Sequence, residues 1–227
     1  MTQLLVSVTN VKEAKVALEN GADIIDLKDP QKGALGALSI DQINAVVAYV
    51  NSQNSTNIKT SATIGDIPMK ANLIANQVAE LGKTNIDFIK IGFFETEDYQ
   101  PCLDALSAFV KMGKRLIAIL FAEITYPVDM IKRIKQAGFV GVLIDTMNKN
   151  GLTLLDFYSE EKRQEFVKEV NKHELQFGLA GSLKLQHVEM LNKLNPNYMG
   201  FRGGVCEGNQ RQLELNPDKI QAIRKLL

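Results

Sequence analysis

The sequence predicts one α/β domain, a (β/α)8 TIM barrel that spans residues 1–227. Short apolar runs typical of strands alternate with amphipathic helical stretches eight times along the chain. Each strand-plus-helix unit averages about 28 residues, which suits a barrel of ~200–250 residues. The alternative is an open doubly wound sheet. That fold usually carries a glycine-rich phosphate motif after its first strand, whereas here Thr9, Asn10 and Val11 follow it.

The first three units show the pattern most clearly. In the first helix Ala14, Ala17 and Leu18 have the spacing of one helical face, and Asn20 with Gly21 ends it. The second helix begins at Ser39, an expected N-cap. We expect strands over 4–8, 24–27 and 60–64, and helices over 11–19, 39–51 and 69–81.

The remaining five units repeat this alternation. Gly138 closes the fifth helix, and the charge-rich stretch 160–174 indicates a solvated helix face. The last two strands each run into a glycine-rich turn. We expect strands over 88–93, 116–121, 142–147, 177–180 and 198–201, and helices over 97–112, 128–136, 159–173, 184–194 and 217–227.

Composition narrows the class of function. The chain has 26 basic and 26 acidic residues, so it lacks the basic footprint expected of a nucleic-acid-binding protein. Two cysteines, Cys102 and Cys206, do not make a disulfide framework. We find no signal segment and no apolar stretch near the ~18 residues of a membrane span, so we expect a cytoplasmic protein.

Three lysines lie at or near the ends of apolar strand-like runs. Lys28 follows Asp-Ile-Ile-Asp-Leu, Lys90 lies within Phe-Ile-Lys-Ile-Gly, and Lys149 comes shortly after Leu-Ile-Asp-Thr-Met. Burying an ammonium is costly, and both desolvation and neighbouring cations lower an ammonium pKa. An amine freed in this way can attack a carbonyl, so these lysines suggest Schiff-base chemistry.

Strand alternation predicts that the charged side chains converge. Successive strand residues face opposite sides, and the outer face of a barrel meets apolar helices. Asp26, Lys28, Lys90 and Asp145 therefore point inward on even strands, near the carboxyl ends that form the active-site face of such barrels. Lys149, four residues beyond Asp145, should overhang the same mouth.

The turns after the last two strands are candidates for a phosphate site. Gly181 and Ser182 follow the seventh strand, and Arg202, Gly203 and Gly204 follow the eighth. Glycine lets backbone N–H groups approach an anion, and arginine adds a charge-assisted contact. Barrels of this class often bind phosphate at these two turns.

Other interpretations stay open at this point. A lysine–aspartate pair at a barrel mouth can be a plain ion pair. A sugar-phosphate isomerase or epimerase could use Asp26 and Asp145 as acid and base, and a non-catalytic barrel needs only the glycine-rich turns. His173 and His187 lack the spacing of metal ligands, so no metal site is predicted.

Several motifs together resemble the (5-formylfuran-3-yl)methyl phosphate synthases. The resemblance spans nearly the whole chain, and its motifs occur in the family's order. Only the segment 122–126 is shorter than the usual loop and lacks the family's Gly-Tyr-Ala-Asp pattern. The matching motifs are Asp-Ile-Ile-Asp-Leu-Lys-Asp-Pro at 23–30, Ser-Ala-Thr-Ile-Gly-Asp-Ile-Pro at 61–68, Phe-Ile-Lys-Ile-Gly at 88–92, Leu-Ile-Asp-Thr at 143–146, Lys-Asn-Gly at 149–151, Leu-Ala-Gly-Ser at 179–182 and Gly-Phe-Arg-Gly-Gly-Val-Cys at 200–206.

The resemblance implies a barrel enzyme and an aldolase-like lyase. Such an enzyme condenses two molecules of glyceraldehyde 3-phosphate into a furan aldehyde phosphate for methanofuran-type carriers, with loss of phosphate and water. By motif, Lys28 would form the Schiff base, Lys90 would accept the proton, and Asp26, Asp145 and Lys149 would position groups and move protons. As partners we expect a triose phosphate and further copies of the chain, without nucleic acid, membrane, cofactor or metal.

Overall fold

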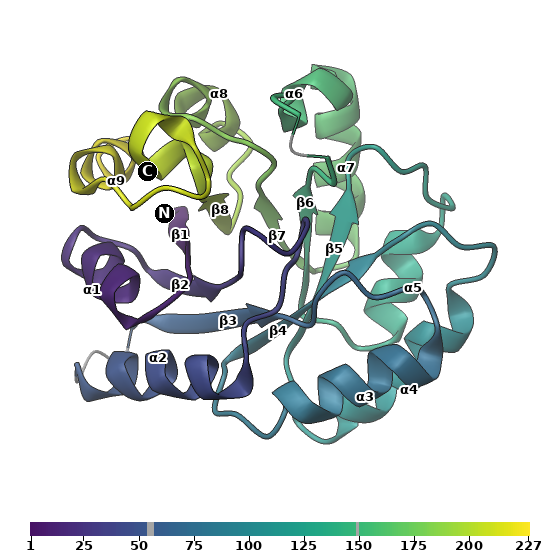
Figure 1. Ribbon diagram of the computed structural model, residues 1–227. Coiled ribbons are helices and arrows are strands. Elements are labelled where there is room, and N and C mark those ends of the chain that lie inside the picture. The colour runs from purple at the N-terminus through teal and green to yellow at the C-terminus, as the bar shows by residue number, and fades with distance from the viewer. Residues whose placement is uncertain (54–56, 149) are drawn as a thin grey trace.

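The computed structural model describes residues 1–53, 57–148 and 150–227. Within them, eight parallel strands pair in sequence order and close into a barrel, which confirms the predicted fold (Figure 1). The strands are β1 (Gln3–Val8), β2 (Ile24–Leu27), β3 (Lys59–Thr63), β4 (Phe88–Phe93), β5 (Leu116–Phe121), β6 (Gly141–Asp145), β7 (Gln176–Leu179) and β8 (Tyr198–Phe201).

Helices surround this barrel and alternate with its strands (Figure 1). The C-terminal helix α9 lies beside α1, so the two ends of the chain meet in the ring. The α-helices are α1 (Val11–Glu19), α2 (Ile40–Ser52), α3 (Ala71–Leu81), α4 (Gln100–Lys111), α5 (Met130–Gln136), α6 (Leu154–Phe157), α7 (Glu160–Lys172), α8 (Val188–Asn192) and α9 (Pro217–Arg224). Short 3-10 helices are η1 (Leu185–His187), η2 (Gly203–Val205) and η3 (Glu207–Asn209).

Strand alternation divides the apolar residues into two clusters, as predicted. Ile25, Leu27 and Ile89 face outward and pack in the large cluster between strands and helices. Phe88 and Leu143 face inward and belong to a smaller cluster that fills the barrel. Every second position of a strand is thus left free to carry an inward polar group at the barrel mouth.

Side-chain caps begin two of the helices, and the cap at Ser39 was predicted. Ser39 caps α2 by accepting from Gln42 N, and the Gln42 side chain accepts from Ser39 N in return. Asn10 caps α1 by accepting from Glu13 N at 3.0 Å. These caps satisfy N–H groups that have no acceptor within the helix.

Several helical stretches differ from the sequence expectation; among them, α4 begins at Gln100 instead of residue 97, and α9 ends at Arg224 instead of residue 227. The stretch 184–194 divides into η1 and α8, and α5 begins at Met130 instead of residue 128. The short helix α6 was not predicted, because four residues are too few to show a helical period. Among the described residues, none of the helices is both long and apolar enough to cross a membrane.

Candidate active site

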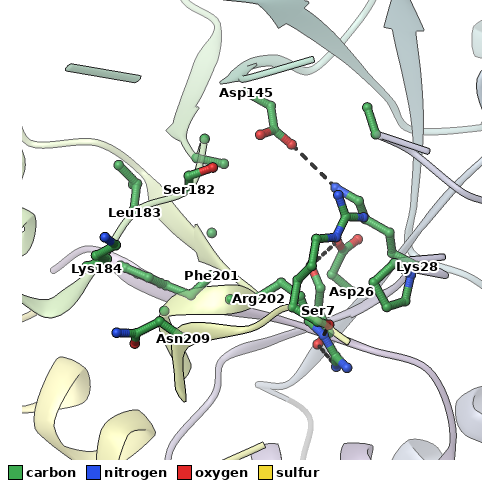
Figure 2. Close-up of a pocket in the computed structure, with 18 of the residues that line it drawn as sticks. Ser7, Asp26, Lys28, Asp145, Ser182, Leu183, Lys184, Phe201, Arg202 and Asn209 are labelled. Carbon is green, nitrogen blue, oxygen red and sulfur yellow. Dashed lines mark hydrogen bonds and ion pairs between the residues drawn. The ribbon is translucent and has the colours of Figure 1, made fainter. Parts of the chain in front are cut away.

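An ion pair joins the ends of β2 and β6. Lys28 directly follows β2, Asp145 is the last residue of β6, and Lys28 Nζ lies 3.4 Å from Asp145 Oδ2. Both residues are buried, with 8% and 5% of their surface exposed. Asp145 Oδ1 also accepts a hydrogen bond from Thr146 N at 2.7 Å, which helps fix the carboxylate. Figure 2 shows the pair on one side of a pocket.

A second ion pair lies deeper in the barrel. Lys90 Nζ is 2.5 Å from Asp26 Oδ1, and these residues are 3% and 1% exposed. The strand register sets Ser7 beside Asp26 and Asp26 beside Ser61. Ser7 Oγ donates to Asp26 Oδ2 at 2.9 Å, and Ser61 Oγ donates to Asp26 Oδ1 at 2.7 Å. The buried carboxylate therefore has partners on both oxygens, as a buried charge requires.

Burial lowers the pKa of Lys90 below its ordinary value. The carboxylate of Asp26 opposes this shift because it favours the ammonium, while the charge of Lys28 adds to the shift. Lys90 is therefore more readily available as a free amine than a solvent-exposed lysine. A free amine at this depth can accept a proton.

Both ion pairs line one large pocket at the carboxyl ends of the strands. Its volume is about 810 Å³, and Asp26, Lys28, Lys90 and Asp145 all contribute to its wall. The predicted phosphate residues line the same pocket. The described part of the chain contains no group of three or more His, Cys, Asp or Glu side chains that could hold a metal ion.

The two glycine-rich turns meet at the edge of this pocket. Gly181 has φ +100° and Ser182 has φ +52°, so two consecutive residues adopt left-handed backbone conformations. A Cβ at Gly204 would lie 2.2 Å from Leu183 O, so the turn after β8 packs directly against the turn after β7. Successive backbone N–H groups in a turn can form a concave anion site. In Figure 2, Ser182, Leu183 and Lys184 lie across the pocket from Lys28.

Arg202 lines the pocket, but its guanidinium binds other groups of the protein. It forms a two-pronged ion pair with Glu13, at 2.6 and 3.0 Å. Its remaining N–H groups donate to the carbonyl oxygens of Ser7, Arg211 and Leu213. All five donors of a guanidinium are thereby used. Only the backbone of this residue is left to contact a phosphate.

Arg211 is a site residue that motif reasoning did not single out. It lines the pocket and donates from Nη2 to Gly33 O at 2.9 Å, which links the turn after β8 to the loop after β2. Fewer of its donors are engaged by described residues than those of Arg202. It lies in a loop nine residues beyond Arg202, where the sequence has no strand or helix periodicity that could indicate the direction of a side chain.

Ser7 and Ser61 were also not predicted as site residues. The signal that could have found them is a small polar residue at an inward position of an otherwise buried strand. Their partner Asp26 lies 19 and 35 residues away, so the hydrogen bonds depend on strand pairing. Lys149, the remaining predicted catalytic residue, lies outside the described residues.

The short segment after β5 is held by two side chains. Tyr126 Oη donates to Phe93 O at 2.6 Å and accepts from Phe121 N at 2.9 Å, which ties the segment to the ends of β4 and β5. Glu123 accepts from Met147 N at 2.8 Å and from Asn148 N at 2.9 Å. The segment therefore supports the loop after β6, which belongs to the pocket wall.

Comparison with known families gives the site a context. The family model described as 4-HFC-P synthase matches residues 4–224. The chain belongs to the 4-HFC-P synthase family. A Methylorubrum extorquens protein provisionally named (5-formylfuran-3-yl)methyl phosphate synthase is 40% identical over 225 residues, which cover 99% of this chain and 91% of the relative. The (5-formylfuran-3-yl)methyl phosphate synthase of Methanocaldococcus jannaschii is 33% identical over 92% of both chains.

Solved structures of other barrels share the fold of this family member. Phosphoribosyl anthranilate isomerase from Thermus thermophilus superposes with a TM-score of 0.64 at 13% identity, and 99% of this chain and 98% of that chain are covered. The 3-hexulose-6-phosphate synthase of Salmonella typhimurium gives a TM-score of 0.62 at 14% identity, with both chains fully covered. At such low identity the likeness concerns the barrel alone.

Proposed function

We propose that this member of the 4-HFC-P synthase family makes (5-formylfuran-3-yl)methyl phosphate from two molecules of glyceraldehyde 3-phosphate, with loss of phosphate and water. The proposed chemistry is that of an aldolase-like lyase with an imine on Lys28. The product would enter the biosynthesis of a furan-containing cofactor, as the names of the relatives suggest.

The observation that carries the proposal is a pair of buried lysines in one pocket. Lys28 and Lys90 both line the 810 Å³ pocket, and each is paired with a carboxylate. Burial of two amines is costly and is tolerated mainly where their reactivity is used. One amine can hold the substrate covalently while the second moves protons beside it.

The proposed reaction starts at Lys28. Its free amine attacks the aldehyde carbon of the first triose phosphate, and loss of water gives an iminium. Asp145 is placed to move protons during this step, because its Oδ2 lies 3.4 Å from Lys28 Nζ. The iminium draws electrons from the neighbouring carbon and so acidifies its C–H bond.

Lys90 is the proposed base for that C–H bond. Its lowered pKa favours the free amine, and Asp26 stabilises the ammonium that forms when the proton arrives. The resulting enamine expels phosphate from the next carbon, and that carbon then bonds to the central carbon of the second triose phosphate, which has isomerised to its ketone form. Ring closure and loss of two water molecules give the furan, and water releases the product from Lys28.

The substrate phosphates are proposed to bind at the two glycine-rich turns. Gly181, Ser182, Gly203 and Gly204 line the pocket there, and their backbone N–H groups are the proposed donors. Arg211 supplies the positive charge that Arg202, held by Glu13, cannot offer. With the phosphate bound at these turns, Lys28 would face the aldehyde end of the triose phosphate.

Product analysis tests the proposal. The enzyme is incubated with glyceraldehyde 3-phosphate as the sole substrate, and the products are identified by mass spectrometry and phosphate assay. We expect the furan aldehyde phosphate and one phosphate released per furan formed. Lys28→Arg should abolish both products, since arginine cannot form the imine. A sugar-phosphate epimer as the product, formed equally by Lys28→Arg, would instead support acid–base chemistry by Asp26 and Asp145.

A further inference from the structure

A second cavity opens at the other end of the barrel. Its volume is about 190 Å³. Its rim is formed by residues at or next to the N-terminal ends of four strands, namely Gln3, Lys59, Arg115 and Gln176. Gln3, Arg115 and Gln176 are exposed, so the cavity communicates with solvent on the face opposite the substrate pocket. Ser61, Lys90 and Tyr198 also line it.

Tyr198 lines this cavity, and its hydroxyl is a polar group that no described residue satisfies. The side chain is buried at 5% exposure, and Oη has no hydrogen-bond partner in the described part of the chain. The ring occupies space left by Gly178, where a Cβ would lie 2.1 Å from Tyr198 Cε2. A buried hydroxyl without a partner is destabilising, so a partner from solvent is expected.

Water is the partner that we expect for this hydroxyl. A polar cavity holds a water molecule once it offers roughly 10–15 Å³ and two to four polar contacts. The 190 Å³ cavity is far larger than this. Ser61 and Lys90 line it together with Tyr198, so hydroxyl and amine groups are available as further contacts. Burial and the nearby charge of Asp26 raise the pKa of Tyr198, which keeps its hydroxyl protonated as a donor.

Lys90 lies between the two cavities. Of the described residues, Lys90 and Leu5 line both the substrate pocket and the N-terminal cavity. We propose that the N-terminal cavity is a water-filled proton route to Lys90, and that Tyr198 is a positioning residue whose hydroxyl holds the innermost water. The inference rests on the proposed function only for the role of Lys90 as the proton acceptor.

The route carries the proton that Lys90 accepts out to solvent. The free amine takes a proton from the substrate carbon and becomes an ammonium, while the electron pair of the C–H bond enters the enamine. The ammonium then gives one proton to the cavity water next to it, and an excess proton leaves to solvent at the rim. Lys90 returns to the free amine without passing the proton back through the occupied substrate pocket.

Tyr198→Phe tests this assignment, because it removes the hydroxyl and keeps the ring that fills the space over Gly178. Tyr49→Phe, which removes a phenol from α2 outside both cavities, is the matched control. We expect kcat of Tyr198→Phe to fall roughly tenfold, as for loss of a positioned proton-relay contact. KM for the triose phosphate should stay within twofold, and the solvent deuterium isotope effect on kcat should increase. Unchanged kcat and isotope effect would overturn the proposal, as would an equal loss in Tyr49→Phe.

A substrate-free measurement separates this inference from the proposed function. High-resolution crystal structures of the wild type and of Tyr198→Phe should show an ordered water on Tyr198 Oη that also contacts Lys90 or Ser61. That water should be lost in the variant while the Lys90–Asp26 pair is kept. A wild-type cavity without this water would overturn the inference even if the enzyme condenses triose phosphate. The expected water does not depend on which aldehyde is the substrate.

Discussion

Lys28 Nζ lies 3.4 Å from Asp145 Oδ2, an ion pair that links strands on opposite sides of the barrel. The second pair, Lys90 with Asp26, links β4 to β2, which are separated by β3. All four side chains thus come from even-numbered strands, whose inward residues share layers in such barrels. This arrangement holds two amines close together without leaving either charge unpaired.

Asp145→Asn should separate the chemical role of this carboxylate from its structural role. The amide keeps the size of the side chain but can neither take a proton from Lys28 nor balance its charge. We expect kcat to fall by roughly 100-fold or more, the usual range for loss of a proton-transfer group. Asp129→Asn, an exposed ion-pair position on the N-cap of α5, is the control. Wild-type kcat in a folded Asp145→Asn protein would contradict the assignment.

The lowered pKa of Lys90 predicts how stability depends on pH. Between its folded-state pKa and its ordinary value of 10.5, the unfolded chain binds one proton more than the folded chain. The free energy of unfolding should therefore rise with pH in this window, by at most about 1.4 kcal/mol per unit. It should fall as pH drops toward the folded-state pKa.

Urea unfolding at pH 7.0 and 9.5 tests this for the wild type and for Asp26→Asn/Lys90→Met. The double variant removes the titrating amine together with the carboxylate that would otherwise stay buried alone. The wild type should gain more stability with pH than the double variant. Parallel changes in both proteins would show that Lys90 titrates as an ordinary lysine.

The two arginines of the last turn should give opposite phenotypes. Arg202→Met leaves Glu13 without its partner in a largely buried ion pair, which should destabilise the protein by roughly 3 kcal/mol. Arg211→Met should leave the free energy of unfolding nearly unchanged but raise KM for triose phosphate by roughly 10-fold or more, through loss of a charge-assisted contact. Thermal unfolding and initial-rate kinetics measure the two effects. The reverse pattern would assign the phosphate to Arg202.

Gly181→Ala should raise KM for triose phosphate, in addition to destabilising the fold through backbone strain. Gly181 and Gly113 have φ +100° and +84°, so alanine costs ~1–2 kcal/mol at either position. Only at Gly181 would the new Cβ also crowd a neighbour, at 3.0 Å from Thr146 Cγ2, whereas Gly113 has no described atom within 4 Å. We expect Gly181→Ala to lose more stability than Gly113→Ala, and only Gly181→Ala to raise KM. Equal KM values would place the phosphate elsewhere.

The inward groups of the site could be predicted because their orientation depends on local alternation. Asp26 and Lys90 lie in short buried strands, and Lys28 directly follows one, so their orientation is fixed by the positions of isoleucine and leucine on the outward face. Closure into a barrel then follows from the repeated strand–helix order. These features need no knowledge of distant contacts.

Contacts between distant segments could not be predicted in the same way. Arg202 pairs with Glu13 across 189 residues, and this contact exists only because β8 pairs with β1. Arg202, which was predicted as a phosphate ligand, therefore has a side chain that joins the end of β8 to α1. The division of 184–194 into η1 and α8 likewise depends on packing, since the stretch alone has an ordinary helical pattern.

Imine trapping tests the central claim most directly. Borohydride is added to the enzyme with glyceraldehyde 3-phosphate, and the digested protein is mapped by mass spectrometry. We predict a reduced triose phosphate adduct on Lys28, absent without substrate and absent from Lys28→Arg. An active enzyme with unmodified Lys28, or with its adduct on Lys90, would contradict the account.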